Sequence, residues 1–249
     1  MIFKKVSMKR VLCILFVSVL FINCAKKEVH INDLQERNGL MYEVNSKEVF
    51  TGSAKSYYAN GKVDLEENYT QGKLDGITKR YYEDGHVKAE ANYKNGVLDG
   101  SFKEYYKSGK LELEKTYKAG KLEGSKKSYF EDGQAAIEMT YKHGELEGVT
   151  KKYYEDGQLE IEMTYKNGVE HGITKGYYEH GQVKVEASYK NGELDGVSKE
   201  YYKNGQLQGE TSYKDGVLDG MMKGYYEDGR LKGEANYKNG VIDGEIKRY

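Results

Sequence analysis

The chain has 249 residues, of which 32% are charged and 38% hydrophobic, with 30 Gly, 25 Tyr, no Trp and no Pro. The low apolar share argues against an ordinary compact domain, and the many tyrosines argue against disorder, because disordered chains are poor in aromatic residues. The net charge is −1, with lysine and glutamate interleaved and no basic stripe. Nucleic-acid binding, which depends on neutralising phosphates, is therefore disfavoured. The composition fits a thin sheet with much exposed surface.

The N-terminal 23 residues have the pattern of an export signal. A basic segment that ends at Arg10 precedes a 12-residue apolar run, Val11 to Ile22, and then Asn23 and Cys24. Twelve residues are too few for a helix that spans a bilayer, which needs about 20, but they suit the core of a signal peptide. A buried helix or a short membrane anchor is the alternative. We interpret residues 1–23 as a signal peptide and residues 24–39, which lack periodicity, as a tether.

Cys24 stands where bacterial lipoproteins carry their lipidated cysteine. The segment resembles their lipobox, although Asn23 replaces the usual small residue and Phe21 the usual leucine. The resemblance implies cleavage before Cys24, its acylation with chains such as palmitate, and attachment to a bacterial envelope membrane, with the outer membrane favoured. Cys13 would leave with the signal, so the mature chain could form no internal disulfide.

From about residue 40 to 249 the sequence repeats every 24 residues. Glycine recurs at 52, 76, 100, 124, 148, 172, 196, 220 and 244, and further glycine and tyrosine series keep the same step. In the unit that begins at Gly148, strands are expected at 149–154 and 159–165, because Leu159, Ile161, Met163 and Tyr165 alternate with polar residues. Glycines every 9–15 residues leave no room for a stable helix.

The turn between these two strands contains Glu155, Asp156 and Gly157, with Asp-Gly supplying positive φ. A two-residue Asp-Gly turn would place Tyr154 on the face of Leu159, whereas a three-residue turn with a bulge would place Tyr153 there. Both readings leave one tyrosine of each pair on the solvent side. We therefore predict partner binding at the pairs, with these candidate residues: Tyr81, Tyr82, Tyr105, Tyr106, Tyr153, Tyr154, Tyr177, Tyr178, Tyr201 and Tyr202.

The motif Tyr-Lys-Asn-Gly-x-x-Asp-Gly, as in residues 93–100 and 237–244, resembles the MORN repeat, and the tyrosine pair before Asp-Gly resembles its bacterial variant. The resemblance covers about residues 40–249, as one degenerate unit, eight regular units and a partial last strand. It implies an all-β fold: an elongated, twisted, single-layer antiparallel β-meander of tandem hairpins. It implies little about function, although some members of the variant are labelled antitoxins.

No residue set points to catalysis. The glutamates at 66, 90, 114, 138, 162, 186, 210 and 234 form a column, but equivalent sites two strands apart are separated by ~9.6 Å, too far to share one metal ion or to act as a catalytic pair. We expect them to pair with lysines on a wet face. The aspartates before glycine fit a turn role, and the five histidines show no ligand spacing. No cofactor or metal site is predicted.

The prediction is a non-enzymatic, envelope-attached repeat protein that binds an unidentified protein partner, with display at the surface or in the periplasm left open. A structural envelope scaffold without a diffusible ligand, and an antitoxin or immunity protein, are the alternatives, and glycan binding is a minor fourth. The array ends at Tyr249 beside Lys247 and Arg248, charges that can guard a sheet edge against aggregation. Edge-to-edge pairing into a homo-oligomer is a further hypothesis.

Overall fold

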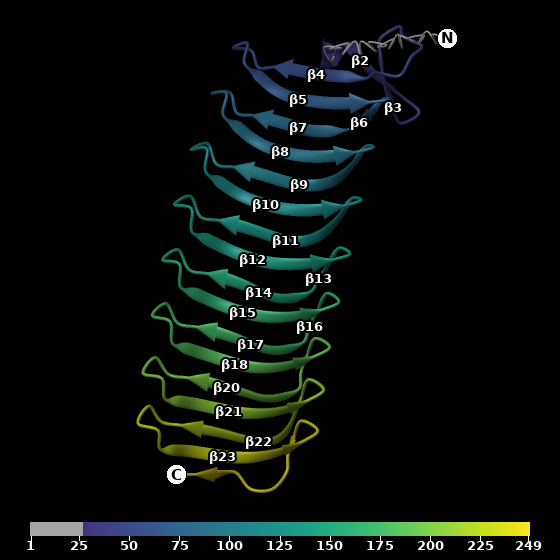
Figure 1. Cartoon of the computed structure of the whole chain (residues 1–249). Coiled ribbons are helices and arrows are strands. Elements are labelled where there is room, and N and C mark those ends of the chain that lie inside the picture. The colour runs from purple at the N-terminus through teal and green to yellow at the C-terminus, as the bar shows by residue number, and fades with distance from the viewer. Residues whose placement is uncertain (1–26) are drawn as a thin grey trace, which may run out of the picture.

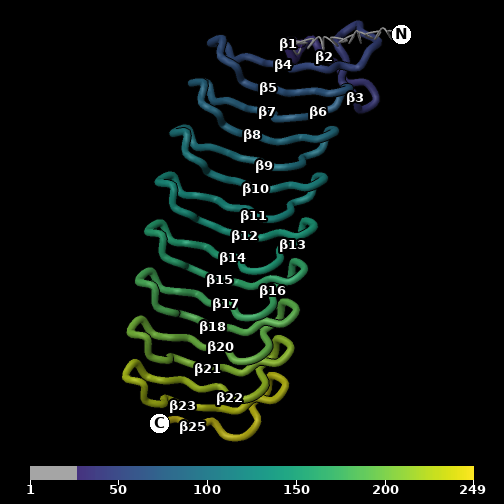
Figure 2. Tube along the Cα trace, viewed as in Figure 1, coloured from purple at the N-terminus to yellow at the C-terminus, as the bar shows by residue number. Residues whose placement is uncertain are grey.

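A computed structural model describes residues 27–249 as one long open sheet built from consecutive antiparallel hairpins. Figures 1 and 2 show the strands stacked in chain order, from β4 near the N-terminal end to β23 near the C-terminal end. The expected all-β meander of tandem hairpins is confirmed. Cys24, the predicted lipidation site, lies outside the described residues.

The main sheet has 23 strands, and β2 and β3 form a separate two-stranded sheet. The elements are β1 (Glu28–His30), η1 (Ile31–Asp33), β2 (Leu34–Arg37), β3 (Leu40–Glu43), β4 (Gly52–Tyr57), β5 (Val63–Thr70), β6 (Lys73–Leu74), β7 (Gly76–Tyr81), β8 (Val87–Lys94), β9 (Val97–Tyr105), β10 (Leu111–Lys118), β11 (Lys121–Tyr129), β12 (Ala135–Lys142), β13 (Glu145–Leu146), β14 (Gly148–Tyr153), β15 (Leu159–Lys166), β16 (Val169–Glu170), β17 (Gly172–Tyr177), β18 (Val183–Lys190), β19 (Glu193–Leu194), β20 (Gly196–Tyr201), β21 (Leu207–Lys214), β22 (Val217–Tyr225), β23 (Leu231–Lys238), β24 (Val241–Ile242) and β25 (Lys247–Arg248).

Two turn types alternate along the array. The turn between β15 and β16 is a two-residue loop closed by the pair Lys166↔Val169. Its central residues Asn167 and Gly168 have φ of 50° and 77°, as a type I′ turn requires. Because Asn and Gly tolerate this left-handed region better than other residues, the Asn-Gly dipeptide fixes the hairpin at this end of the unit.

The other turn is the three-residue loop Glu155-Asp156-Gly157. The amide of Tyr154 donates to the carbonyl of Gln158, and the amide of Gly157 donates to the carbonyl of Tyr154. In this loop only Gly157 has positive φ, at 83°, which matches a type I turn followed by a glycine bulge. This settles the alternative left open by the sequence: Tyr153 pairs with Leu159.

A second irregularity corrects the predicted alternation of the following strand. In β15 the register shifts after Leu159, so that Tyr153 pairs with Leu159 but Lys152 pairs with Ile161. Successive residues of a strand point to opposite faces, so Leu159 lies on the face opposite Ile161, Met163 and Tyr165. The bulge was missed because it inserts a residue without changing the apparent period of two.

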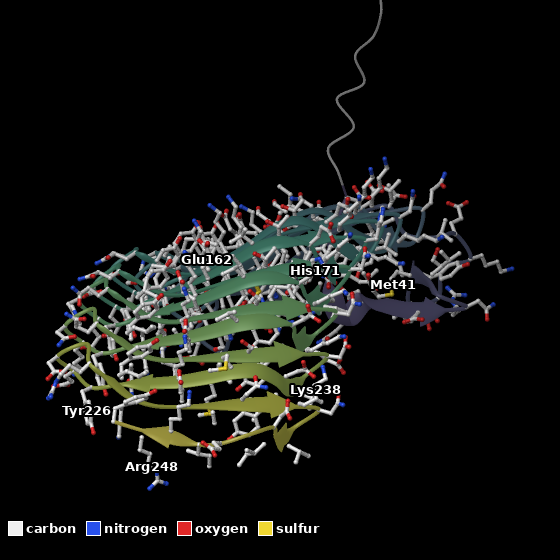
Figure 3. The ribbon with its side chains drawn as sticks, turned by 90° about the horizontal axis from the view of Figure 1, so that it is seen from below. Met41, Glu162, His171, Tyr226, Lys238 and Arg248 are labelled. Atoms are coloured by element: carbon white, nitrogen blue, oxygen red, sulfur yellow. The ribbon has the colours of Figure 1, made fainter. Side chains whose placement is uncertain are left out.

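The two faces of the array differ in chemistry. We call one the hollowed face. In β15 it carries Ile161, Met163 and Tyr165. It also carries the leucine that pairs with the equivalent tyrosine of the preceding unit, as in Tyr141↔Leu146. We call the other the ladder face; it carries Lys151 and Glu162, which pair directly across β14 and β15. Figure 3 shows side chains along both faces of the ribbon.

The N-terminal segment differs from the expected tether. β1 adds to β4 in parallel, and β2 and β3 form an antiparallel hairpin; Figure 3 places Met41 on this hairpin. Leu34, Phe50, Ala54 and Tyr69 form a buried cluster beneath it. β3, which lies in the degenerate first unit expected from about residue 40, pairs with β2 and not with the array, so the segment caps the first strands of the array. Elsewhere burial is slight, and among the described residues no large side chain is fully buried.

Candidate functional site

The ladder face is a row of lysine–glutamate ion pairs between neighbouring strands. The pairs Lys79–Glu90, Lys127–Glu138 and Lys175–Glu186 have N···O distances of 2.9, 3.0 and 2.9 Å. The hydrogen bond from Lys127 is the main reason why the pKa of Glu138 is lowered. The expectation that the glutamate column pairs with lysines on a wet face is confirmed for these members of the column: Glu90, Glu138, Glu162, Glu186, Glu210 and Glu234. Such exposed pairs stabilise weakly, by about 0–1 kcal/mol each.

The first tyrosine of each pair lies on the ladder face, and in most units it donates a hydrogen bond to a glutamate of the preceding unit. The hydroxyl of Tyr129 donates to Glu114 at 2.7 Å and that of Tyr153 to Glu138 at 3.1 Å. Burial, and then the bond to the Glu114 carboxylate, raise the pKa of Tyr129 to about 12. These contacts span 15 residues and join successive hairpins, so this tyrosine column stabilises the stacking of units.

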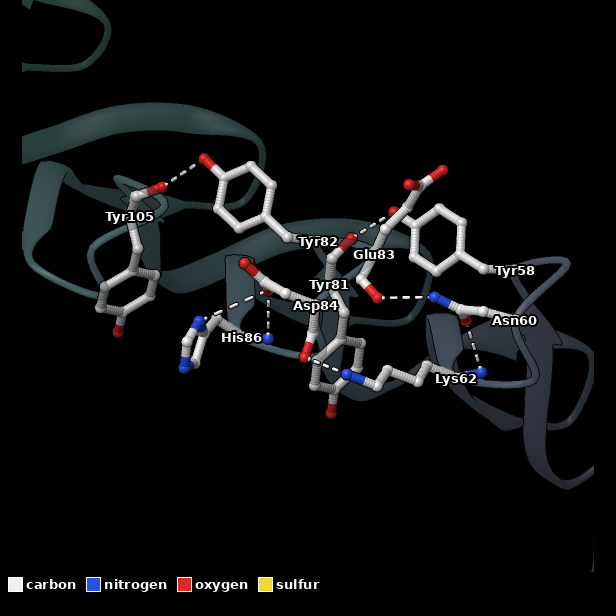
Figure 4. Close-up of polar contacts among 9 residues, drawn as sticks. All are labelled: Tyr58, Asn60, Lys62, Tyr81, Tyr82, Glu83, Asp84, His86 and Tyr105. Atoms are coloured by element: carbon white, nitrogen blue, oxygen red, sulfur yellow. Dashed lines mark hydrogen bonds and ion pairs between the residues drawn. The ribbon is translucent and has the colours of Figure 1, made fainter.

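The second tyrosine of each pair also bonds to the next unit, but through the backbone. Tyr58 donates to the carbonyl of Tyr81 at 2.5 Å, and Tyr82 donates to the carbonyl of Tyr105 at 2.7 Å (Figure 4). The same contact recurs at Tyr106, Tyr154, Tyr178 and Tyr202. A carbonyl 23 residues away is thus satisfied by a side chain.

All ten tyrosines predicted to bind a partner are partly buried, and partner binding at them stays a prediction. The first members, Tyr81, Tyr105, Tyr153, Tyr177 and Tyr201, lie on the ladder face, and the second members, Tyr82, Tyr106, Tyr154, Tyr178 and Tyr202, lie at the rim of the hollowed face. Nine of the ten hydroxyls donate a hydrogen bond within the array. The hydroxyl of Tyr177 donates none within residues 27–249. Of the second members, Tyr82 lines a hollow on the hollowed face.

A third tyrosine column has the free hydroxyls that the pairs lack. Within residues 27–249, the hydroxyls of the following residues form no hydrogen bond: Tyr93, Tyr117, Tyr189, Tyr213 and Tyr237. These residues lie on the hollowed face, opposite the leucine column, as in the pair Tyr93↔Leu98. The sequence displayed this column, but nothing in its alternation distinguished free hydroxyls from bonded ones. The column is the candidate that the sequence prediction missed.

The hollowed face owes its name to recesses at both ends of the array. One of about 600 Å³ lies over β7, β8 and β9 and is lined by Tyr82, Ala89, Ala91, Tyr93 and Phe102, among others. Another of about 290 Å³ lies near the C-terminal end, against Met222, Ala235, Tyr237 and Ile246. Aromatic walls beside small floor residues make a surface that a partner's side chains can enter.

Acidic side chains form hydrogen bonds between neighbouring units at the two-residue turns. The carboxylate of Glu147 accepts a hydrogen bond from the amide of Asn167, 20 residues on, at 2.8 Å. Equivalent contacts come from Asp75, Asp99, Glu123, Asp195 and Asp219. This contact extends the turn role expected for the aspartates.

One unit departs from this pattern in two columns at once. His171 occupies the acidic position, and no side chain of the described residues accepts from the amide of Asn191. Just before it, Glu170 replaces the leucine of the column and accepts a hydrogen bond from the buried Thr174 hydroxyl. The charge of Glu170 also raises the pKa of Tyr165 and of Tyr189, after the larger effect of burial.

Within residues 27–249, no group of three or more His, Cys, Asp or Glu side chains is placed to hold a metal ion. No helix in this part of the chain is long and apolar enough to cross a membrane.

An open array of hairpins with a constant 24-residue spacing and three tyrosine columns defines a repeat protein of the MORN class. The model of the MORN repeat variant matches eight tandem segments of the chain, at residues 50–71, 74–95, 98–119, 122–143, 146–167, 170–191, 194–215 and 218–239. The chain belongs to this family of repeats.

Other comparisons add little. No curated protein matches the chain. Among solved structures, one similar chain comes from "Crystal Structure of TcdB2-TccC3-Cdc42", at 14% identity and a TM-score of 0.21. The alignment covers 78% of the present chain and 13% of that chain, and at this TM-score it supports no argument about fold or function.

Proposed function

We propose that the protein is a non-enzymatic binding scaffold that holds a protein partner on its hollowed face. The observation that carries the proposal is the third tyrosine column, in which five hydroxyls form no hydrogen bond within residues 27–249 and two of these residues, Tyr93 and Tyr237, line recesses. Tyrosine is favoured at recognition surfaces because a rigid ring buries area at low entropic cost and its hydroxyl adds a directed bond. Near-identical units also favour binding at several points along one partner.

The proposal includes attachment to a bacterial envelope membrane through acylated Cys24, with the outer membrane favoured. Its support is the basic segment, the 12-residue apolar run and the cysteine that follows. The first described strand, β1, begins at Glu28. Lipidation at Cys24 would thus hold the capped end of the array at the membrane. A Cys24→Ser variant should move from the detergent-soluble membrane fraction to the aqueous fraction, and equal partition of both proteins would contradict the attachment.

The binding proposal is tested by capture from an envelope extract with the chain from residue 24 onward. The test variant is Tyr117→Phe with Tyr189→Phe, which removes two free hydroxyls and leaves the packing of both rings. The control is Ile173→Ser, because this side chain is 55% exposed on the ladder face.

Binding that is saturable, weakened by the tyrosine changes and unchanged by the control would support a partner on the hollowed face. Each lost hydroxyl bond should cost about 0.5–1.5 kcal/mol, or roughly 2- to 12-fold in affinity. Capture that depends on Ile173 but not on the tyrosines would contradict the assignment of the face. Absence of any partner would favour the alternative of an envelope scaffold without a ligand.

A further inference from the structure

The larger recess exists because one unit has a smaller floor than its neighbours. Ala89 stands where the flanking units carry Leu65 and Leu113, and Ala91 stands where the central units carry methionine, at Met139 and Met163. The missing side-chain volume leaves a hollow of about 600 Å³ in a face that the central units fill. The same column narrows again to Gly209 and Gly233 near the C-terminal end, where the smaller recess lies.

Charges of both signs surround this floor without pairing. Arg80 and Glu104 are the cross-strand partners of Ala89 on its two sides, so they stand two strand spacings apart, or ~9.6 Å. Neither the Arg80 nor the Glu104 side chain makes an ion pair or hydrogen bond within the described part of the chain. The two charges are too far apart to form an ion pair with one another. Both side chains line the hollow, so they contact whatever binds in it.

The negative side of the hollow is reinforced by Glu112, which also lacks an ion pair among residues 27–249. The charges of Glu112 and Glu104 add to the effect of burial in raising the pKa of the Tyr82 hydroxyl. Phe102 and Tyr93 close the side of the recess. The recess thus has an apolar floor and an aromatic wall among Arg80, Glu104 and Glu112, with Lys88 and Glu67 also in its lining.

We propose that this hollow binds an extended peptide segment of a partner protein, in which an acidic, an apolar and a basic residue alternate with residues that face away. The apolar side chain would lie over Ala89, the acid against Arg80, and the base against Glu104. Alternate residues of an extended chain face the same side and are about 7 Å apart, so flexible acidic and basic side chains on either side of the apolar residue can reach two charges that are ~9.6 Å apart. The inference rests on the proposed function and names the segment that the hollowed face receives.

The direct test uses two peptides that differ only in charge: acetyl-Glu-Thr-Leu-Thr-Arg-amide and acetyl-Gln-Thr-Leu-Thr-Gln-amide. Each is titrated into the chain from residue 24 onward with labelled alanine methyl groups, and the Ala91 methyl reports on the hollow. The charged peptide should bind two- to tenfold more tightly at low salt, and the advantage should shrink at high salt. Equal affinities, or no saturable shift with either peptide, would overturn the proposal.

A filling variant tests the place. Ala89→Leu installs the residue that both flanking units carry, so the sheet should fold and the recess should close. Val185→Leu makes the matched change at the same position of another unit. The charged peptide should lose at least tenfold in affinity for the first variant and none for the second; unchanged affinity in both would overturn the proposal. If Ala89→Leu leaves partner capture intact while the tyrosine changes abolish it, the proposed function stands and this inference fails.

Discussion

The unit interface at His171 is predicted to be a weak joint that a single substitution repairs. At the equivalent position of the preceding unit, Glu147 accepts from the amide of Asn167 at 2.8 Å, and both units turn through Asn-Gly. His171→Glu should therefore create the same bond to the amide of Asn191. A hydrogen bond of this kind contributes about 0.5–1.5 kcal/mol. In an array whose units contact only their neighbours, that gain should stay local.

The assay is hydrogen exchange of the Asn191 amide together with thermal unfolding. The bond should slow exchange at Asn191 by about 2- to 10-fold, since 1.4 kcal/mol corresponds to a factor of ten. The melting temperature should rise by roughly 1–6 °C for a chain of this size. Glu147→His is the reciprocal control and should speed exchange at Asn167 by the same factor. If His171→Glu leaves the exchange rate of the Asn191 amide unchanged while Glu147→His has its expected effect, the carboxylate–amide hydrogen bond is not what distinguishes the two interfaces.

Three further predictions concern the array as a whole. Because the folded-state pKa values of Glu138 and Glu186 are lowered, their contribution to the free energy of unfolding is present above the unfolded pKa of about 4.3 and is lost as pH falls. The tyrosine pKa values are raised on folding, as at Tyr129, so their contribution to the free energy of unfolding is present below about pH 10 and is lost as pH rises. A midpoint of urea unfolding that stays constant from pH 3 to 11 would contradict both predictions. Tyr154→Phe, which loses a 2.8 Å bond to a carbonyl, should cost about 0.5–1.5 kcal/mol, whereas Tyr189→Phe should cost almost nothing, as measured by urea unfolding. The edge of β25 is paired on one side only within the described residues, so concentration-dependent dimers are expected, and a strictly monomeric profile in multi-angle light scattering at high concentration would argue against edge pairing.

The repeat and its turns could be read from the sequence because they depend on glycine chemistry. Gly157 and Gly168 sit at φ of 83° and 77°, a region that other residues enter only at a cost. A glycine column therefore reports the backbone directly. The turn between the tyrosine pair and the second strand could not be chosen this way, since a Glu-Asp-Gly segment fits both a two-residue and a three-residue loop.

Contacts between units were invisible for a different reason. The hydroxyl of Tyr154 reaches the carbonyl of Tyr177, and a carbonyl is present at every residue, so no sequence pattern marks the partner. The N-terminal cap was missed because it occurs once: β1 pairs in parallel with β4 across an intervening hairpin, and a single copy has no period to detect. Prediction succeeded where the signal repeats and failed where a contact is unique or made to the backbone.

A regular array can acquire a specific site where one unit carries a residue that differs from the equivalent residues of its neighbours. A column of leucines or ion pairs adds the same contribution at each step, and no unit then differs from its neighbour as a binding place. Ala89 removes volume from one unit and leaves Arg80 and Glu104 unpaired around it, while His171 removes a bond from another. Neither change improves the stacking of hairpins, so stability alone does not account for them. The two substitutions, Ala89→Leu and His171→Glu, thus separate the requirements of the sheet from those of recognition: both should preserve or strengthen the fold, and only the first should abolish binding of the charged peptide.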